Sequence, residues 1–345
     1  MPSTLLKIGI GAFDGNAYLA TVDLTLSTGL LVIGAAAFNQ CSSLSSLSVP
    51  ASVLDVGEGA FDGTPWQDGQ AIPFIINNRV IIKGQMSGDI TLPATITAIN
   101  ADAFYGSALT SIILPEGLLR IGDEAFSYCA NLVNITIPDS VLTLGMATFA
   151  NSGLTSATVG SSIKELPSYL FSSNAALVSI TLPAGLQEIG DLAFYECISL
   201  TGVILPDGLK AIGINSFAKT QALTSMTIPG SISFIPQEAF SLSGLTNLVI
   251  SEGVHSIGDS AFQDCPSLAS VSLPSTLFEI GNYAFEGCEA LTEIVIPLSV
   301  SWVGGYCFDN CSSLSIYLEA ISTPETWDSD WNVDNRPVTY SYVQE

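Results

Sequence analysis

The sequence predicts a right-handed β/α superhelix, a solenoid of about 13 repeats of 22 or 23 residues. We expect it to be mostly β, with one parallel sheet and short helical or irregular return segments. Three observations predict this fold class: a phenylalanine recurs at near-constant spacing, a glycine precedes it, and an alternating apolar segment ending in proline follows it. A fixed period of this size is typical of solenoids, in which stacked repeats share one continuous core.

The recurring phenylalanine sets the period. Most steps between copies are 22 or 23 residues, the first step is 25 and one step is 43. One repeat cannot bury its own apolar face, so we expect the rings to stack in a shared core. Their positions are Phe13, Phe38, Phe61, Phe104, Phe126, Phe149, Phe171, Phe194, Phe217, Phe240, Phe262, Phe285 and Phe308.

Each repeat also carries a strand and a corner. In "LVNITIP", apolar and polar residues alternate, which predicts a short strand with one buried face. Pro138 ends this strand, because proline cannot donate a ladder hydrogen bond. Gly122 and Gly190, each four residues before a phenylalanine, mark tight corners where a side chain would strain the backbone. The dipeptide "AF" then begins the return segment.

The chain divides into a solenoid over residues 1–322, with a hairpin-type insertion near 62–98, and a C-terminal cap over 323–345. Within the insertion, "FIINNRVIIKG" predicts two strands joined at Asn77 and Asn78, a pair that tolerates the positive φ of a tight turn. This insert is either a structural element or a recognition loop. The N-terminal end begins inside a repeat, so we expect the natural chain to continue upstream or this open edge to associate.

Charge and hydropathy argue against nucleic-acid binding, binding to an anionic membrane and a membrane-spanning helix. The chain has 32 acidic and 8 basic residues, a net charge of −24. That balance opposes binding to nucleic acid or to an anionic membrane. The longest apolar run, "GLLVIGAAAF", is about half of what a membrane-spanning helix needs. The opening "MPSTLLKIGIGAF" already belongs to a repeat and does not resemble a signal peptide.

The sequence predicts neither an enzyme nor a cofactor site. His255 is the only histidine, and no P-loop, G-x-S-x-G or H-E-x-x-H motif occurs. In the tail, Asp328, Asp330, Asn332 and Asp334 alternate like the first half of a calcium loop. However, Val333 replaces the required glycine and no glutamate follows at the twelfth position. A capping turn and a calcium site are the two alternatives for this tail.

Six of the seven cysteines lie three residues after the repeat phenylalanine. In such a column side chains repeat at about 4.8 Å, whereas a disulfide needs Cβ atoms about 3.8 Å apart. We therefore expect buried free thiols that act as small apolar residues. A bond between Cys307 and Cys311 is left open. The six column positions are Cys41, Cys129, Cys197, Cys265, Cys288 and Cys311.

The repeat "IGxxAFxxCxxLxxIxLP" resembles the BspA-type, or Treponema-type, leucine-rich repeats over nearly the whole chain. "GTPW" at Gly63 to Trp66, followed by "FIINNRVIIKG", and the ending "STPETWDSDWN" match the same family. The resemblance implies a leucine-rich repeat solenoid. It also implies a bacterial or protozoan surface protein that binds host proteins or other cells, so we expect a non-enzymatic adhesion module at the cell surface or secreted.

The strand face is the predicted binding surface. Within "LxxIxLP", the second and fourth residues after the leucine point outward. Of the twenty such residues only Glu293 is charged; others include Ser46, Ser48, Ile113, Gly202, Ile204, Val249 and Val295. The partner-binding candidates are Ser111, Asn134, Thr136, Ser156, Thr158, Ser179, Thr181, Ser225, Thr227, Asn247, Ser270 and Ser272.

Three interpretations of this face stay open. Small hydroxyl side chains suit a crowded sheet, so the pattern can be structural. A neutral strip can instead bind a protein or glycan with little desolvation of charge. As an alternative function, the hydroxyl-rich strands can bind a polysaccharide or a crystal surface.

Overall fold

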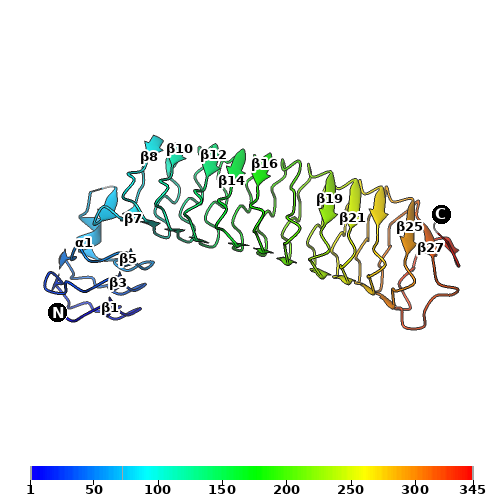
Figure 1. Ribbon diagram of the computed structural model, residues 1–345, viewed down its shortest axis with the longest axis horizontal. Helices are drawn as coiled ribbons and strands as arrows, with labels where there is room; N and C mark the ends of the chain where they lie inside the picture. The colour runs from blue at the N-terminus through cyan, green and yellow to red at the C-terminus, as the bar shows by residue number, and fades with distance from the viewer. Residues whose placement is uncertain (1, 72, 344–345) are drawn as a thin grey trace. The chain divides into compact units, whose positions relative to one another are not determined.

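The computed structural model describes residues 2–71 and 73–343. The chain forms two compact units, Met1–Leu132 with Ser140–Thr148 and Val133–Asp139 with Phe149–Glu345. In total the chain makes about 15 turns of a β-solenoid with almost no helix, which confirms the predicted fold class. Within each unit, successive coils lie side by side (Figure 1).

Every regular coil of unit 1 contributes to one or both of two series of parallel strands. The first series follows the predicted "LxxIxLP" segments: β2 (Thr21–Asp23), β4 (Ser46–Ser48), β8 (Ser87–Thr91) and β10 (Ala108–Ile113). The second series precedes the repeat glycine: β1 (Lys7–Ile8), β3 (Val32–Ile33), β5 (Asp55–Val56), β9 (Ala98–Ile99), β11 (Arg120–Ile121) and β13 (Thr143–Leu144).

Unit 2 repeats the two series more regularly. The first series comprises β12 (Asn134–Thr136), β14 (Ser156–Thr158), β16 (Ser179–Thr181), β19 (Ser225–Ile228), β21 (Asn247–Ile250), β23 (Ser270–Ser272), β25 (Glu293–Ile296) and β27 (Ser315–Leu318), which β28 (Val338–Thr339) extends. The second comprises β15 (Glu165–Leu166), β17 (Glu188–Ile189), β18 (Ala211–Ile212), β20 (Phe234–Ile235), β22 (Ser256–Ile257), β24 (Glu279–Ile280) and β26 (Trp302–Val303). The expectation of one parallel sheet was therefore incomplete, because a second ladder of two-residue strands lines each unit.

The return segments are turns, and not helices. In every copy, the residues two before and two after the phenylalanine have a left-handed φ, as at Leu192 (54°) and Glu196 (58°). This alternation points the backbone N–H groups of Leu192, Phe194 and Glu196 along the stack. They donate to the carbonyls of Ile214, Ser216 and Ala218 in the next coil, at 2.9, 2.8 and 3.1 Å. The returns thus form a third ladder that the sequence did not predict.

The phenylalanine column is the core of each unit, as predicted. Phe194 is fully buried, and its ring stacks on Phe171 at 5.7 Å and on Phe217 at 5.1 Å, with interplanar angles of 11° and 15°. In unit 1, Phe104 and Phe126 stack in the same way at 5.0 Å. Because each ring packs on the next, coils are held mainly by their neighbours.

The repeat glycines serve a different purpose from the one expected. Gly122 and Gly190 do not have a positive φ, so the corner does not strain a side chain. A Cβ on Gly213 would instead lie 2.3 Å from the Asp191 nitrogen and 2.4 Å from the Gly190 carbonyl carbon. The backbones of successive coils approach so closely here that only hydrogen fits.

The insertion interrupts unit 1. Thr64 caps the short helix α1 (Pro65–Asp68), accepting a hydrogen bond from the Gln67 nitrogen. The strands β6 (Phe74–Ile76) and β7 (Val80–Lys83) then pair antiparallel. Asn77 and Asn78 both have a positive φ, 53° and 54°, in the turn between them, so the predicted hairpin is present.

The segment after Thr323 covers the last coil of unit 2. Trp331 packs edge-on against Phe308, the final ring of the column, and Trp327 packs edge-on against Trp331. The Asp330 carbonyl accepts from the Tyr306 nitrogen at 2.9 Å. These contacts replace those that a further repeat would make.

Candidate binding surfaces

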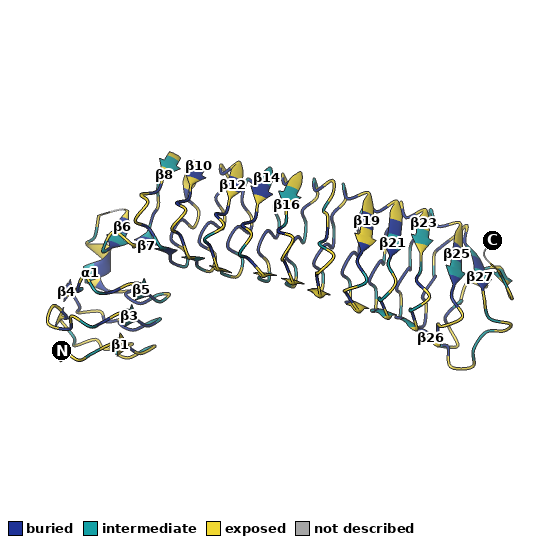
Figure 2. Cartoon of the chain, in the orientation of Figure 1, coloured by how far each residue is buried: buried dark blue, intermediate teal, exposed yellow. Residues whose placement is uncertain are grey.

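Unit 2 arranges the predicted strand-face residues in columns. Asn134, Ser156 and Ser179 are register partners in β12, β14 and β16, and Thr136, Thr158 and Thr181 form the parallel column. In the following strands, Ser225, Asn247 and Ser270 form one column, and Thr227, Val249 and Ser272 the other. All are exposed except Ser156 and Val249, which are half-buried. Figure 2 shows exposed positions along β12, β16 and β19.

Hydrogen bonds within the columns occupy part of this face. The Ser156 hydroxyl donates to Asn134 Oδ1 at 2.6 Å, and the Ser270 hydroxyl donates to Asn247 Oδ1 at the same distance. Each asparagine thus orients the serine of the next coil. The hydroxyls keep lone pairs that can accept hydrogen bonds from a partner.

The face is broken between β16 and β19. The segment around Gly202 forms only an isolated bridge to Ser179, where the sequence predicted a strand. Glycine adds no side chain to the column and weakens a strand. Ile204, the other outward residue of this repeat, is 88% exposed. The gap is an open groove of about 820 Å³, whose apolar lining includes Ile180, Val203 and Leu205.

In unit 1 the corresponding face carries a charge that the sequence analysis missed. Asp89 in β8 is the register partner of Ser111 in β10. Its carboxylate accepts hydrogen bonds from Thr110 and Ser111 at 2.6 and 2.7 Å, which lowers the pKa of Asp89. The strand of this coil lies within the 43-residue step and follows no repeat phenylalanine, so the repeat pattern did not predict it.

The tail acidic residues are engaged in turns. Asp328 Oδ1 accepts from the Asp330 nitrogen at 2.8 Å, and Asn332 Oδ1 accepts from the Arg336 nitrogen at 2.8 Å. Asp334 forms an ion pair with Arg336 and accepts from the Asn310 nitrogen at 3.1 Å. Within residues 2–71 and 73–343, no three His, Cys, Asp or Glu side chains are grouped so as to hold a metal ion. The calcium alternative stays an untested prediction.

All seven cysteines are free and buried, as predicted for the six of the column, and the structure has no bond between Cys307 and Cys311. Thiols of the column donate to the phenylalanine carbonyl of the preceding coil, as Cys197 does to Phe171 at 3.2 Å and Cys311 does to Phe285 at 3.1 Å. Burial raises the pKa of Cys197 to about 12. A thiol held in this way is protonated and unreactive near neutral pH.

His255 lies exposed at a coil edge, with its ring 6.0 Å from that of Phe278.

Among the described residues, no helix is long and apolar enough to span a membrane.

A family model describing the BspA type leucine rich repeat region matches the chain in six copies, over residues 1–72, 97–213 and 187–315. The chain belongs to the BspA-type leucine-rich repeat family. This confirms the resemblance drawn from the repeated motif, and the unmatched residues 73–96 coincide with the hairpin insert. Membership in the family implies a protein-interaction or surface-adhesion module.

Solved structures agree on the fold. A leucine-rich repeat protein from Bacteroides ovatus is 24% identical, with a TM-score of 0.53, over 97% of this chain and 87% of that one. A leucine-rich repeat protein from Eubacterium ventriosum is 23% identical, with a TM-score of 0.52, over 89% and 84%. No curated protein matches the sequence. At these identities the likeness shows the fold alone.

Proposed function

We propose that this protein is a non-enzymatic recognition module that binds a protein partner through the strand face of unit 2. The groove around Gly202 and Ile204 is the observation that carries the proposal. An apolar groove flanked by Thr181, Ser225 and Asp207 has the anatomy of an interface, in which an apolar centre lies inside a polar rim.

The contrast in charge supports this choice of surface. The chain carries a net charge of −24. In contrast, six first-series strands of unit 2 contain only Ser, Thr, Asn, Ala, Ile, Met, Leu and Val: β12, β14, β16, β19, β21 and β23. A partner docking on these columns desolvates no carboxylate of the strands, and among the described residues Asp207 is the one carboxylate that lines the groove between them. The acidic surroundings would attract a partner with a basic periphery and speed its association at low salt. The proposed partner therefore presents an apolar side chain within an uncharged patch that has a basic rim.

A second candidate is binding to a polysaccharide or a crystal surface. Its support is the regular spacing of hydroxyls on β12, β14 and β16, because register partners in adjacent parallel strands repeat about every 4.8 Å. Such a ligand would use the columns themselves and would be indifferent to the groove between them. The groove residue Ile204 therefore separates the two candidates.

The test compares two isoleucines of equal exposure. Ile204 is 88% exposed in the groove, and Ile321 is 86% exposed in the final segment of unit 2. Binding of the native chain is first measured by biolayer interferometry against purified matrix proteins and immobilised glycans. A protein hit is then retested with Ile204→Asp and, as the matched control, Ile321→Asp.

For a protein hit we expect Ile204→Asp to weaken binding at least tenfold, because an interface centre loses an apolar anchor. Ile321→Asp should bind as the native chain does. If Ile204→Asp binds a protein hit normally, the groove is not the site. If only glycans bind, and bind equally to both variants, the second candidate replaces the first.

We also propose that the module acts at the cell surface or after secretion, without enzymatic activity. The family assignment supports the surface location. Fractionation of the native cells with an antibody to this chain would test it, and a purely cytosolic signal would contradict it.

A further inference from the structure

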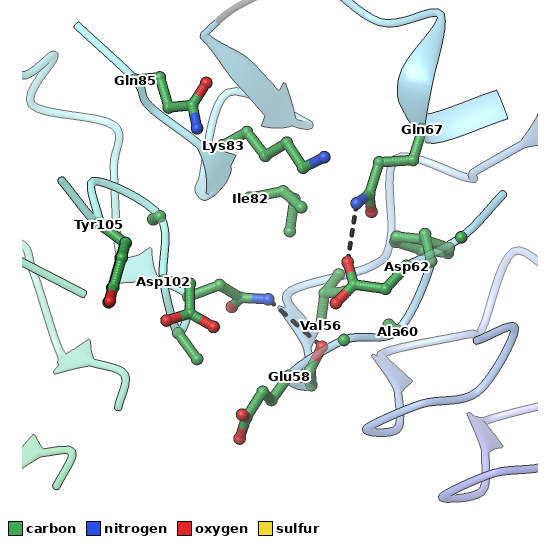
Figure 3. A pocket seen from close by; sticks show the side chains of 17 residues that line it. Val56, Glu58, Ala60, Asp62, Gln67, Ile82, Lys83, Gln85, Asp102 and Tyr105 are labelled. Atoms are coloured by element: carbon green, nitrogen blue, oxygen red, sulfur yellow. Dashed lines mark hydrogen bonds between the residues drawn. The ribbon is translucent and has the colours of Figure 1, made fainter. Parts of the chain in front are cut away.

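A second pocket lies in unit 1, where the insert meets the regular coils. Its volume is about 530 Å³, within the range of small-ligand sites. Phe61, Gln67 and Ile82 are buried in its wall, and small residues around Gly57 leave room for an occupant. Figure 3 shows the side chains that line it. None of them belongs to the strand face of unit 2.

Gln67 is the feature that points to a ligand. Its side chain is only 4% exposed, and its Nε2 donates to Asp62 Oδ1 at 2.8 Å. Among the described residues, no group donates to its buried Oε1. A buried amide oxygen without a donor costs stability, so its presence in a pocket wall calls for a hydrogen-bond donor. In Figure 3 the amide points from α1 towards Asp62.

The neighbouring amide in the pocket shows the contrast. Asn100 is equally buried, but its Nδ2 donates to the Gly57 carbonyl at 3.3 Å. Its Oδ1 accepts from Arg120 Nη2 at 3.0 Å. Asn100 is therefore satisfied by the protein, whereas Gln67 keeps an acceptor for something that enters the pocket.

The charges of the pocket select among possible ligands. Glu58, Asp62 and Asp102 lie exposed on the rim, and the half-buried Lys83 extends into the same space. Within the described residues, Lys83 takes part in no ion pair. An anion would meet three carboxylates, and a cation would meet the Lys83 ammonium. A neutral molecule with several hydroxyls can donate to the carboxylates and Gln67 while accepting from Lys83.

An aromatic wall completes the site. Tyr105 is 41% exposed at the rim, and its ring is 5.3 Å from that of Tyr128. An aromatic side chain beside a few fixed polar groups is the usual composition of a small-molecule site. From the unpaired Gln67 oxygen, the presence of both carboxylates and an ammonium group, and this aromatic wall, we infer that the pocket binds a neutral saccharide.

The state of the carboxylates agrees with this assignment. Burial, followed by the repulsion of neighbouring carboxylates such as Asp123 and Asp62, raises the pKa of both Glu58 and Asp102. Hydroxyl donors from a ligand would stabilise the ionised carboxylates and relieve this repulsion.

Saturation-transfer-difference NMR on the full chain tests the inference with five probes. The neutral set is lactose, maltotriose and N,N′-diacetylchitobiose; the charged set is glucosamine and 3′-sialyllactose. We expect at least one neutral sugar to bind saturably and more tightly than both charged sugars. Calcium chloride, titrated separately by calorimetry, should give no saturable heat.

Two variants and one control locate the site. Asp102→Asn should weaken binding of the neutral sugar roughly tenfold, because charge-assisted hydrogen bonds are lost. Lys83→Met should also weaken it, and should make glucosamine bind more tightly than in the native chain. Glu116→Gln removes an exposed carboxylate of the same unit outside the pocket and should change nothing. Thermal unfolding of each variant checks that it is folded.

Three outcomes would overturn the inference. They are no saturable binding of any neutral sugar, tighter binding of glucosamine than of neutral sugars by the native chain, or calcium binding that Asp102→Asn abolishes. Binding of a neutral sugar that is insensitive to Asp102→Asn and Lys83→Met would place the saccharide elsewhere. Because the residues are separate, loss of partner binding in Ile204→Asp leaves this result unaffected.

Discussion

The two units use one repeat in different ways. From Phe149 to Phe308, unit 2 repeats with almost no interruption, and the return turns from Phe171 to Phe285 each donate to the next coil through the same three positions. Unit 1 interrupts the pattern with α1 and the β6–β7 hairpin, and a pocket opens where the insert and the coils meet. Regular stacking pairs backbone groups between coils, and the interruption in unit 1 places the unpaired Gln67 oxygen in the wall of a pocket.

Unit 2 supports the same conclusion on a smaller scale. Its one departure on the strand face, at Gly202, is also where an apolar groove opens. The comparison teaches that the repeats supply stability and that departures from them supply the candidate binding sites.

Phe194→Ala should cost about 3–5 kcal/mol of unfolding free energy, because it leaves a cavity between two stacked rings. Urea unfolding followed by circular dichroism measures this change. A cost below about 1 kcal/mol would mean that the phenylalanine column does not hold the coils together.

Gly213→Ala should destabilise unit 2 by about 1–3 kcal/mol, because the new Cβ would overlap the backbone of Asp191. Gly208→Ala is the matched control in the same coil, since nothing lies within 4 Å of its Cβ position. Denaturant unfolding of both variants measures the difference. Equal effects would show that the close approach of coils does not explain the repeat glycines.

Ser260→Gly should stabilise the chain by roughly 0.5–1 kcal/mol, because a left-handed φ of 55° costs an L-residue more than it costs glycine. The control Ser256→Gly, in β22, should destabilise by a similar amount, since glycine weakens a strand. Thermal unfolding compares the two. The same sign for both would contradict the left-handed ladder of return turns.

The smallest effects concern two carboxylates, Glu252 in unit 2 and Glu58 in unit 1, whose pKa values shift in opposite directions. In unit 2, hydrogen bonds led by the Ser275 nitrogen lower the pKa of Glu252, so it stabilises the fold above its ordinary pKa of 4.5. That contribution is lost as pH falls through the lowered value. In unit 1, the raised pKa of Glu58 means that stability is lost as pH rises from 4.5 through the raised value.

At pH 7 we therefore expect Glu252→Gln to destabilise the chain slightly and Glu58→Gln to stabilise it slightly. The effect of Glu58→Gln should fade at pH 3, where this carboxyl is protonated, and the effect of Glu252→Gln should shrink as pH falls through the lowered pKa. NMR titration of the two carboxyl groups, with thermal unfolding at both pH values, measures this. The same sign at pH 7 would contradict the opposite shifts of these two carboxyls.

Features that follow from residues close together in the chain could be predicted from the sequence, and features that depend on contacts between distant segments could not. The phenylalanine period, the strand alternation, the Asn77–Asn78 hairpin and the cysteine column each follow from residue types at fixed spacing, and all are present in the structure. The two-residue strands are too short to show a period. The left-handed turns were not predicted, because residues such as Leu192 and Tyr283, and not glycine alone, adopt a positive φ.

The candidate sites were harder to predict for a related reason. The outward hydroxyls follow from strand alternation, and the structure places them in columns. The groove exists because Gly202 removes a side chain and a strand, which alternation alone does not reveal. The pocket gathers Glu58, Gln67, Lys83 and Asp102 from separate segments, so it exists only once the insert is folded onto the coils.

We propose that the strand face of unit 2 recognises the partner while the buried columns hold the fold. The most direct test replaces Ser179, Thr181, Ser225 and Thr227 together by lysine, and measures partner binding and urea unfolding on the same variant. All four are exposed, so we predict a change in unfolding free energy of about 0.5 kcal/mol or less per site, with binding abolished. If binding survives these four changes but is lost when Asn77, Asn78 and Arg79 in the insert are replaced by alanine, the insert is the recognition site and the claim is wrong.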